Sequence, residues 1–271
     1  MVEILPKVSI VLPTHNGAKY IRLSIDSCLC QTHENIELIT VDDGSTDDTP
    51  EIIRDYKDPR MTYIRHETNR GLPDALNTGF ASATGEYLTW TSDDNYYATE
   101  AIERMVSFST RRNFPFVYCD FYTFDDQHPS NLKLIHLPDV PALERCNNIR
   151  ACFLYSAKVR EVIGDYDPET ALAEDYDYWL RVSKVFPMCH LREALYFYRI
   201  HADSLYHSRL KEVRIADLLV RMKNGILDTG HATRMFIDII ASVRRDSRGP
   251  KAKRFFSTTR KVMALRNIIL S

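Results

Sequence analysis

The sequence predicts an α/β domain with a parallel sheet and helices on both faces, and three observations support this fold class. Over residues 8–124, apolar, β-branched segments that suit strands alternate with segments whose apolar residues recur near the helical period. Turn and helix-start residues such as Gly44 and Pro73 separate the two kinds of segment. The chain has 271 residues, 44% hydrophobic and 27% charged, which suits one large domain with an appendage.

Five strands and the helices between them are expected in the first half of the chain. The expected strands are 8–13, 36–41, 61–66, 87–92 and 116–124. Three of the expected helices are 18–31, 73–83 and 98–110. A further helix is expected to be capped by Thr46 or Asp47 and to run to Tyr56. Strands that alternate with helices form parallel βαβ units and a doubly wound sheet. A long connection follows at 126–150, and 169–186 contains a further helix.

The last quarter of the chain is expected to be helical and basic. Helical spacing recurs over 210–226, 231–245 and 252–270, and residues 206–271 hold 15 Lys and Arg against 5 Asp and Glu. The segment 252–270 has one apolar stripe with basic residues beside or opposite it. Such a helix either lies in a membrane interface or packs on the body of the protein or on a second subunit of a homodimer.

The sequence gives no sign of export or of a membrane span. The six cysteines are scattered without a C-x-x-C pair, which favours a reducing compartment. The first apolar segment is interrupted too early, by Pro6 and Lys7, for a signal peptide, and no apolar run approaches the roughly 20 residues of a span. We therefore expect a cytoplasmic protein, peripheral on the inner face of the membrane if the last helix binds lipid.

Three of the expected strands end in polar residues. The sequence THN at 14–16 follows the first strand, an Asp pair at 42–43 follows the second, and another Asp pair at 93–94 follows the fourth. In doubly wound sheets, ligands bind outside the carboxyl ends of the strands. We therefore expect the three groups to line one crevice, although each group alone also suits a surface turn.

The adjacent carboxylates of Asp93 and Asp94 repel each other unless something compensates them. Mg²⁺ or Mn²⁺ takes oxygen ligands and often binds one or two carboxylates together with substrate phosphates. The alternative is that Asp93, Asp94 or Asn95 caps the helix expected at 98–110. The same ambiguity applies to Asp42 and Asp43, which suit either a nucleotide contact or a helix start.

Two common nucleotide motifs are absent from the sequence. No G-x-G-x-x-G follows the first strand, which argues against a dinucleotide enzyme, and no G-x-x-x-x-G-K-[ST] occurs, which argues against a P-loop NTPase. A nucleotidyltransferase would need a Gly- and Lys-rich phosphate loop, to which PTHNGAKY is a poor match. A receiver domain would carry its acidic pair after the first strand rather than the second.

Three segments in ordered spacing resemble glycosyltransferase family 2. The family's opening is similar to VSIVLPTHNGAKYIRLSIDSCLCQTHENIELITVDDGSTDDT, its next block to NRGLPDALNTGFASATGEYLTWTSDDNYY, and its catalytic acidic segment to AEDYDYWLR. The resemblance covers about residues 1–205. It implies a GT-A fold, a nucleotide-sugar donor and inverting transfer assisted by Mn²⁺ or Mg²⁺.

The resemblance also implies roles for single residues. Asp94 would bind the metal, and His201, in a segment found late in many family members, would reach the metal or the diphosphate. The first position of the family's DXD metal motif is Ser92 here. Asp175 would be the general base that deprotonates the acceptor hydroxyl, with Glu174 beside it. The expected nucleotide contacts are Pro13, Thr14, His15, Asn16, Asp43, Arg70 and Asp93.

Together these observations predict a GT-A-type, Rossmann-like domain at 1–205, with a nucleotide-binding half at 1–95 and a catalytic, acceptor-binding half at 96–205. A basic helical extension follows at 206–271. The expected reaction moves a sugar from a UDP-linked donor to a glycan or lipid-linked acceptor in cell-surface polysaccharide or glycoconjugate synthesis. We expect no nucleic-acid partner. The alternatives are a nucleotidyltransferase and a nucleotide-sugar-binding module without catalysis.

Five aromatic residues near these segments have two possible roles. They either line a sugar site, because aromatic faces suit the C–H surfaces of sugars, or pack in the core. The residues in question are Tyr96, Tyr97, Tyr176, Tyr178 and Trp179.

Overall fold

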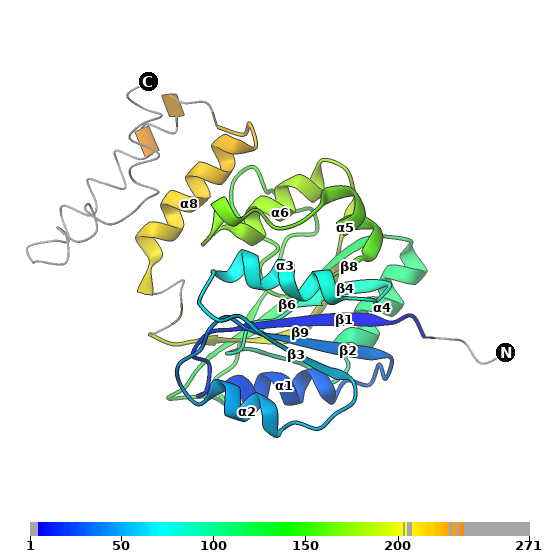
Figure 1. Ribbon diagram of the computed structural model, residues 1–271. Coiled ribbons are helices and arrows are strands. Elements are labelled where there is room, and N and C mark those ends of the chain that lie inside the picture. Colours follow the sequence, from blue (N-terminus) through cyan, green and yellow to red (C-terminus); the bar gives the residue numbers. More distant parts are fainter. Residues whose placement is uncertain (1–4, 203, 205–207, 228–229, 232–233, 236–271) are drawn as a thin grey trace, which may run out of the picture.

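The structure is a computed structural model that describes residues 5–202, 204, 208–227, 230–231 and 234–235. One nine-stranded sheet runs through the described part, with helices on both of its faces (Figure 1). The strand order is β3-β2-β1-β4-β8-β6-β9-β5, and β7 pairs with β6. This architecture confirms the predicted fold class.

Five strands of the sheet point the same way and match the five that the sequence predicts. They are β1 (Val8–Thr14), β2 (Ile36–Asp42), β3 (Met61–Arg65), β4 (Tyr87–Trp90) and β6 (Phe116–Asp125). β1 pairs in parallel with β2 and β4, and β2 pairs in parallel with β3. Every residue of β1 is buried, as its apolar sequence and its central place in the sheet require.

The remaining four strands are not among those the sequence predicts. They are β5 (Tyr96–Tyr97), β7 (Lys133–Ile135), β8 (Phe153–Ser156) and β9 (Met188–Ile200). β8 stands between β4 and β6 and is antiparallel to both, so the sheet is mixed rather than wholly parallel. β9 pairs in parallel with β6. Strands of two to four residues are too short for hydrophobic periodicity to reveal, which explains three of the omissions.

The helices of the first half follow the predicted order. They are α1 (Ile21–Leu29), α2 (Thr49–Asp55), α3 (Leu72–Ser82) and α4 (Ala101–Arg112). α1 and α2 lie on one face of the sheet and α3 lies on the other (Figure 1). α3 packs closely on β1, because a Cβ at Gly79 would overlap the side chain of Val11. Asp47 rather than Thr46 supports the start of α2, since its carboxylate accepts a hydrogen bond from the Thr49 amide at 3.1 Å.

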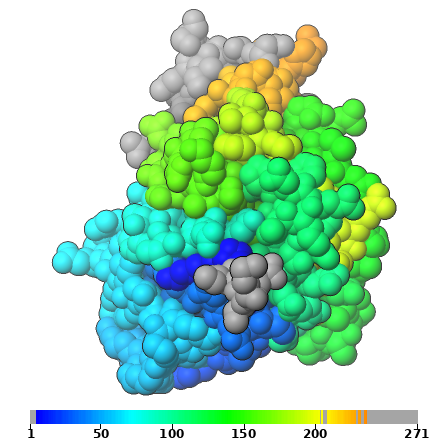
Figure 2. All heavy atoms as spheres, turned by 90° about the vertical axis from the view of Figure 1, so that its right-hand side faces the viewer, coloured from blue at the N-terminus to red at the C-terminus, as the bar shows by residue number. Residues whose placement is uncertain are grey.

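The helices of the second half lie on the α3 side of the sheet, with α8 outermost (Figure 1). They are α5 (Ala157–Ile163), the 3₁₀ helix η1 (Pro168–Thr170), α6 (Glu174–Ser183) and α8 (Leu210–Lys223). Trp179 of α6 is fully buried against Phe116 and Phe153 of the sheet. α8 packs on α6, where Lys223 lies 3.3 Å from the Asp177 carboxylate. Figure 2 shows the yellow-to-orange segment that contains α8 at one end of the molecule.

Some predictions fall beyond what the structure describes. The helix predicted at 252–270 lies outside the described residues, as does most of the helix predicted at 231–245. The expected membrane or subunit contact of the last helix lies outside them too. The division of the chain at residue 205 and of its first part at residue 95 stays a prediction. Across the residues that the structure describes, we find no helix long and apolar enough to cross a membrane.

Candidate active site

The carboxyl ends of five strands meet at one edge of the sheet. β1, β2, β4, β6 and β9 run in the same direction, because β8 reverses direction twice, once against β4 and once against β6. The segments after these strands therefore lie along a single edge, where α/β sheets bind their ligands. This edge carries the THN loop and both Asp pairs, as the sequence predicts, and also His201, which follows β9.

The loops after β1 and β2 bind each other at this edge. The Thr46 amide donates to Asn16 Oδ1 at 2.8 Å, and the Asn16 amide donates to Ser45 Oγ at 2.9 Å. The Nδ1 atom of His15 lies 2.8 Å from the carbonyl oxygen of Asp43. The side chains of His15 and Asn16 stay exposed. The predicted nucleotide contacts at 13–16 are thus held against the loop that carries Asp43.

Asp43 is buried at the end of β2, and its carboxylate has several hydrogen-bond partners within the protein. Its carboxylate accepts hydrogen bonds from the backbone amides of Arg70 and Gly71, at 2.9 and 2.7 Å, and lies 2.7 Å from Nδ1 of His66. These bonds fix the turn that leads into α3. The Arg70 side chain itself is exposed. The nucleotide-contact roles of Asp43 and Arg70 stay predictions.

Asp93 lies beside β1 rather than at a helix start. The Thr14 hydroxyl donates a hydrogen bond to its carboxylate, and a Cβ at Gly17 would overlap the same carboxylate. Burial, and then the neighbouring Asp94 carboxylate, raise the pKa of Asp93 to about 7. Gly17 is a site residue that the sequence reasoning missed, although a glycine next to THN is the signal that would have found it.

Asp94 contacts a side chain that follows the end of β9. Its Oδ2 lies 2.9 Å from Nε2 of His201, and its Oδ1 accepts a hydrogen bond from the Ser92 hydroxyl at 2.7 Å. Nδ1 of His201 is buried and has no hydrogen-bond partner among the described residues. The imidazole also lies edge-on to the Tyr20 ring, at 5.2 Å between centroids. The structure therefore brings the two predicted metal-binding residues into contact.

The alternative that the Asp93–Asp94 segment caps α4 is wrong. α4 begins at Ala101, and Oε1 of Gln31 accepts the hydrogen bond from the Ile102 amide at 3.0 Å. Asn95 instead fixes the turn after β4, since its Oδ1 accepts a hydrogen bond from the Arg199 amide at 2.7 Å. The turn after β4 is therefore bonded to β9 and does not cap α4.

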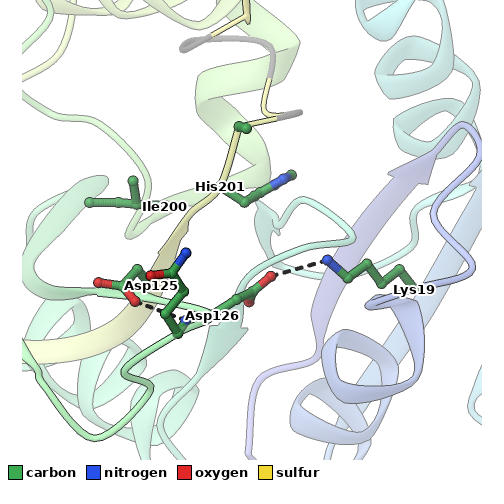
Figure 3. Close-up of a pocket in the computed structure, with 7 residues that line it drawn as sticks. Lys19, Asp125, Asp126, Ile200 and His201 are labelled. Atoms are coloured by element: carbon green, nitrogen blue, oxygen red, sulfur yellow. Dashed lines mark hydrogen bonds and ion pairs between the residues drawn. The ribbon is translucent and has the colours of Figure 1, made fainter.

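A polar cluster beside His201 was not predicted from the sequence. Arg199 donates to Asp126 at 2.7 Å and to the Asp94 carbonyl oxygen at 2.9 Å, and Lys19 pairs with Asp126 at 3.2 Å. Figure 3 shows Lys19 and Asp126 joined across an open pocket of about 490 Å³ that His201 also lines. The alternation of β9 offers a signal for Arg199, because residues two apart on a strand share a face.

Asp175 lies in the first turn of α6, as predicted. Its Oδ2 accepts a hydrogen bond from Nδ2 of Asn147 at 2.8 Å. Burial raises the pKa of Asp175, whereas the hydrogen bond from Asn147 lowers it. Burial raises the pKa of Tyr166 and the Asp175 carboxylate raises it further, while the Trp90 indole at the end of β4 donates a hydrogen bond to the Tyr166 hydroxyl at 3.1 Å. The base predicted by the resemblance is thus linked electrostatically, through Tyr166, to the end of the strand that the Asp pair follows.

The aromatic residues expected either to line a sugar site or to pack in the core lie mainly in the core. Tyr97, Tyr176, Tyr178 and Trp179 are at most 3% exposed, and only Tyr96 is partly exposed. Tyr96 stacks on Phe197 at 4.6 Å between ring centroids. Core packing therefore accounts for four of the five, and a sugar site needs other side chains.

Asp94 and His201 fit the ligand chemistry of a divalent cation. A carboxylate oxygen and an imidazole nitrogen stand together, and one further imidazole nitrogen is buried without a partner in the described part. Within that part no group of three or more His, Cys, Asp or Glu side chains gathers to hold a metal. Two protein ligands suit a cation that takes its other ligands from water and substrate phosphates.

The fold, with polar side chains gathered at the carboxyl ends of the strands, is that of GT-A-type nucleotide-dependent transferases. The chain belongs to glycosyltransferase family 2, because the family described as "Glycosyl transferase family 2" matches residues 9–172. An uncharacterised glycosyltransferase of Rickettsia felis is 33% identical over 211 residues, which cover 73% of this chain but 35% of that protein. The chain thus spans about a third of that relative.

A second relative has a named reaction. It is the Escherichia coli protein WfaP, a UDP-Glc:alpha-D-GlcNAc-diphosphoundecaprenol beta-1,3-glucosyltransferase. It is 30% identical over 230 residues, which cover 82% of this chain and 86% of the relative.

Solved structures share the fold at low sequence identity. TarS of S. aureus in complex with UDP-GlcNAc aligns with a TM-score of 0.65 and 18% identity, over 97% of this chain and 80% of that one. The mannosyltransferase PcManGT of Pyrobaculum calidifontis, in complex with GDP-Man and Mn²⁺, aligns with a TM-score of 0.63 and 15% identity, over 99% and 88%. These likenesses confirm the GT-A-type fold.

Proposed function

We propose that the protein transfers a sugar from a UDP-linked donor to an acceptor hydroxyl with inversion of the anomeric configuration. The observation that carries the proposal is the contact between Asp94 and His201 at the ligand-binding edge of a family 2 sheet. Donor chemistry is supported by WfaP, which is named for UDP-Glc, and by the TarS complex with UDP-GlcNAc. The PcManGT complex with Mn²⁺ supports a divalent cation as cofactor.

Asp94 and His201 would hold the cation with the donor diphosphate. When bound, Mn²⁺ or Mg²⁺ supplies positive charge that stabilises the leaving diphosphate. Ser92 donates to the Asp94 carboxylate and so restricts its orientation. The loop at 13–16, Asp43, Arg70 and Asp93 are proposed to position the nucleotide around this pair.

Asp175 is proposed to act as the general base. It takes the proton from the acceptor hydroxyl while the hydroxyl oxygen forms a bond to the anomeric carbon. The bond from that carbon to the diphosphate oxygen breaks on the opposite side, and the nucleoside diphosphate leaves with the electron pair. One displacement inverts the configuration, and a cation held by Asp94 and His201 would stabilise the leaving group, so that no separate acid is needed.

The acceptor is proposed to be a lipid-linked glycan at the inner face of the membrane. The support comes from WfaP, whose named acceptor is a sugar on diphosphoundecaprenol. Such an acceptor places the enzyme in the synthesis of a cell-surface polysaccharide or glycoconjugate.

A screen for donor hydrolysis tests the proposal. Purified protein with Mn²⁺ is incubated with UDP-Glc, UDP-Gal, UDP-GlcNAc and GDP-Man, and the released nucleotide is measured. We expect turnover with a UDP-sugar that is lost on chelation, and proton NMR of the first sugar product should show the inverted anomer. Binding of a UDP-sugar without any turnover, with or without a GlcNAc-diphospholipid acceptor, would favour the binding module instead.

A further inference from the structure

The connection between β7 and β8 holds the Asp175 carboxylate. Nδ2 of Asn147 lies 2.8 Å from Asp175 Oδ2, while the Tyr176 amide donates to the other oxygen at 2.7 Å. Asp175 and Asn147 come from separate segments, because Asp175 opens α6 and Asn147 precedes β8. The side-chain contact is therefore made by tertiary packing and not by the helix itself.

The neighbours of Asn147 determine which end of its amide faces Asp175. An ionised carboxylate only accepts hydrogen bonds, so the amino group of Asn147 must face it. The Arg150 amide only donates, and it lies 3.5 Å from Asn147 Oδ1. Arg150 has a φ of 60°, which turns the chain back toward Asn147. Both ends of the amide thus have the partner they require.

The segment around Asn147 is fixed on both sides. Leu143 and Ile149 are 3% and 0% exposed, so the chain before and after Asn147 is anchored in the core. The Tyr176 hydroxyl of α6 donates to the Leu143 carbonyl oxygen, and Arg221 of α8 donates to the Glu144 carbonyl oxygen at 2.9 Å. The segment that carries Asn147 is therefore anchored to the core, α6 and α8.

The contact with Asn147 affects the pKa of Asp175. Burial raises the pKa of Asp175, and the hydrogen bond from Asn147 is the largest effect that opposes it. The Tyr176 amide and the Arg150 guanidinium lower the pKa further. The Asp175 carboxylate in turn raises the pKa of Tyr166, which burial already raises, and the neighbouring residue Glu174 is buried. A general base must be ionised before it can accept a proton, so a group that favours the carboxylate form favours the reaction.

We propose that Asn147 is a positioning residue, which keeps the Asp175 carboxylate ionised and fixed in one orientation. This inference rests on the proposed function, because it assigns Asn147 to the base of that reaction. Asn147 does not contact the reacting atoms itself, and its effect passes through Asp175.

Two substitutions at Asn147 separate this role from support of the loop. Asn147→Asp keeps an oxygen for the Arg150 amide but replaces the donor to Asp175 with a second carboxylate, whereas Asn147→Ala removes both contacts. Asn131→Asp, at an exposed residue of the turn between β6 and β7, adds an equal charge elsewhere. Thermal unfolding of each variant shows whether it folds.

The titration of Asp175 gives a readout that needs no substrate. It is followed by ¹³C NMR of aspartate carboxyl carbons, with the Asp175 signal assigned by its loss in Asp175→Asn. We expect the midpoint to move to higher pH in Asn147→Ala and further in Asn147→Asp, with Asn131→Asp unchanged. A midpoint in Asn147→Asp that equals that of Asn131→Asp would overturn the proposal.

Donor hydrolysis then tests the consequence for activity. We expect kcat to fall by roughly tenfold below the wild-type midpoint and to recover at higher pH in Asn147→Ala, with donor KM unchanged. A uniform loss at all pH values in this variant would assign Asn147 a structural role and overturn the proposal. If the wild type turns over no nucleotide sugar, the proposed function fails, and the NMR titration still decides whether Asn147 controls Asp175.

Discussion

The two acidic regions of the active site are built in different ways. Asp93 and Asp94 stand side by side at a strand end, and their contacts come from β1 and from the end of β9. Asp175 stands in the first turn of a helix, and its side-chain contact comes from a loop. Burial raises the pKa of Asp93 and of Asp175, but Asp94 adds to the rise at Asp93 while Asn147 opposes the rise at Asp175.

This difference matches the chemistry proposed for each region. Two adjacent carboxylates concentrate negative charge, which disfavours ionisation until a cation arrives. A general base works alone and must be ionised in advance, so a neutral amide donor suits it better than a second acid. Variants that alter one region should therefore leave the other intact.

The largest expected effect is at the strand end. Asp94→Ala should abolish the Mn²⁺-dependent part of UDP binding, because it removes the carboxylate of the proposed cation site. Calorimetry with UDP, with and without Mn²⁺, measures this. Asp48→Ala, which removes an exposed carboxylate next to α2, serves as the control. Metal-dependent affinity that survives in Asp94→Ala would remove Asp94 from the cation site.

The next effect is at the helix and should be purely catalytic. Asp175→Asn should keep UDP affinity but lower turnover by about 10²–10⁴-fold, the usual contribution of a general base. Initial rates and calorimetry on the same preparation separate the two quantities. Turnover within a few-fold of wild type would take the base role away from Asp175.

Ser92 offers a smaller change at the strand end. Ser92→Ala removes the hydrogen bond to Asp94 and should weaken Mn²⁺ affinity by about 10–100-fold, as loss of a group that orients a metal ligand does. Ser92→Thr keeps the hydroxyl and is the matched variant. Equal Mn²⁺ affinity in wild type and Ser92→Ala would show that the hydroxyl does not orient Asp94.

Gly17 tests how tightly Asp93 is enclosed. Gly17→Ala places a methyl group onto the Asp93 carboxylate and the Thr14 hydroxyl, so it should cost about 1–3 kcal/mol in the free energy of unfolding. Urea unfolding measures the cost. In an Asp93→Ala background the same change should cost clearly less, because the overlap with the carboxylate is gone. Equal costs in both backgrounds would argue against this contact.

The smallest effect concerns the cluster beside the pocket. The Tyr20 hydroxyl and then Arg199 hold the pKa of Asp126 at about 2, below its ordinary value. The ionised Asp126 carboxylate therefore stabilises the folded protein above about pH 4, and this contribution is lost as the pH falls toward 2. Asp126→Asn should therefore lower the free energy of unfolding by about 1 kcal/mol or less at pH 7 and by less still near pH 3. Urea titrations from pH 3 to 7 test the trend, and a gap that widens on acidification would contradict it.

The part of the fold that the sequence predicts is the part set by local patterns. Five strands and six helices, the four of the first half together with α6 and α8, follow from local patterns, and the alternation of strands and helices in the first half places the polar strand ends together. The insertion of β8 between β4 and β6 could not be predicted this way, because a four-residue strand carries no period and its partners lie far along the chain. Asp126 and Arg199 were missed for a different reason, because the contacts that join them to Asp94 and Lys19 link segments far apart in the chain.

By itself, the sequence determined which acids stand at strand and helix ends, because those positions depend on neighbours in the chain. It pointed to Asp93, Asp94 and Asp175, and the family resemblance added His201. Only the tertiary structure decided that His201 meets Asp94 across 107 residues and that Asn147 holds Asp175. Such contacts depend on how the sheet orders its strands and how a long connection packs on a helix, and no local pattern encodes either.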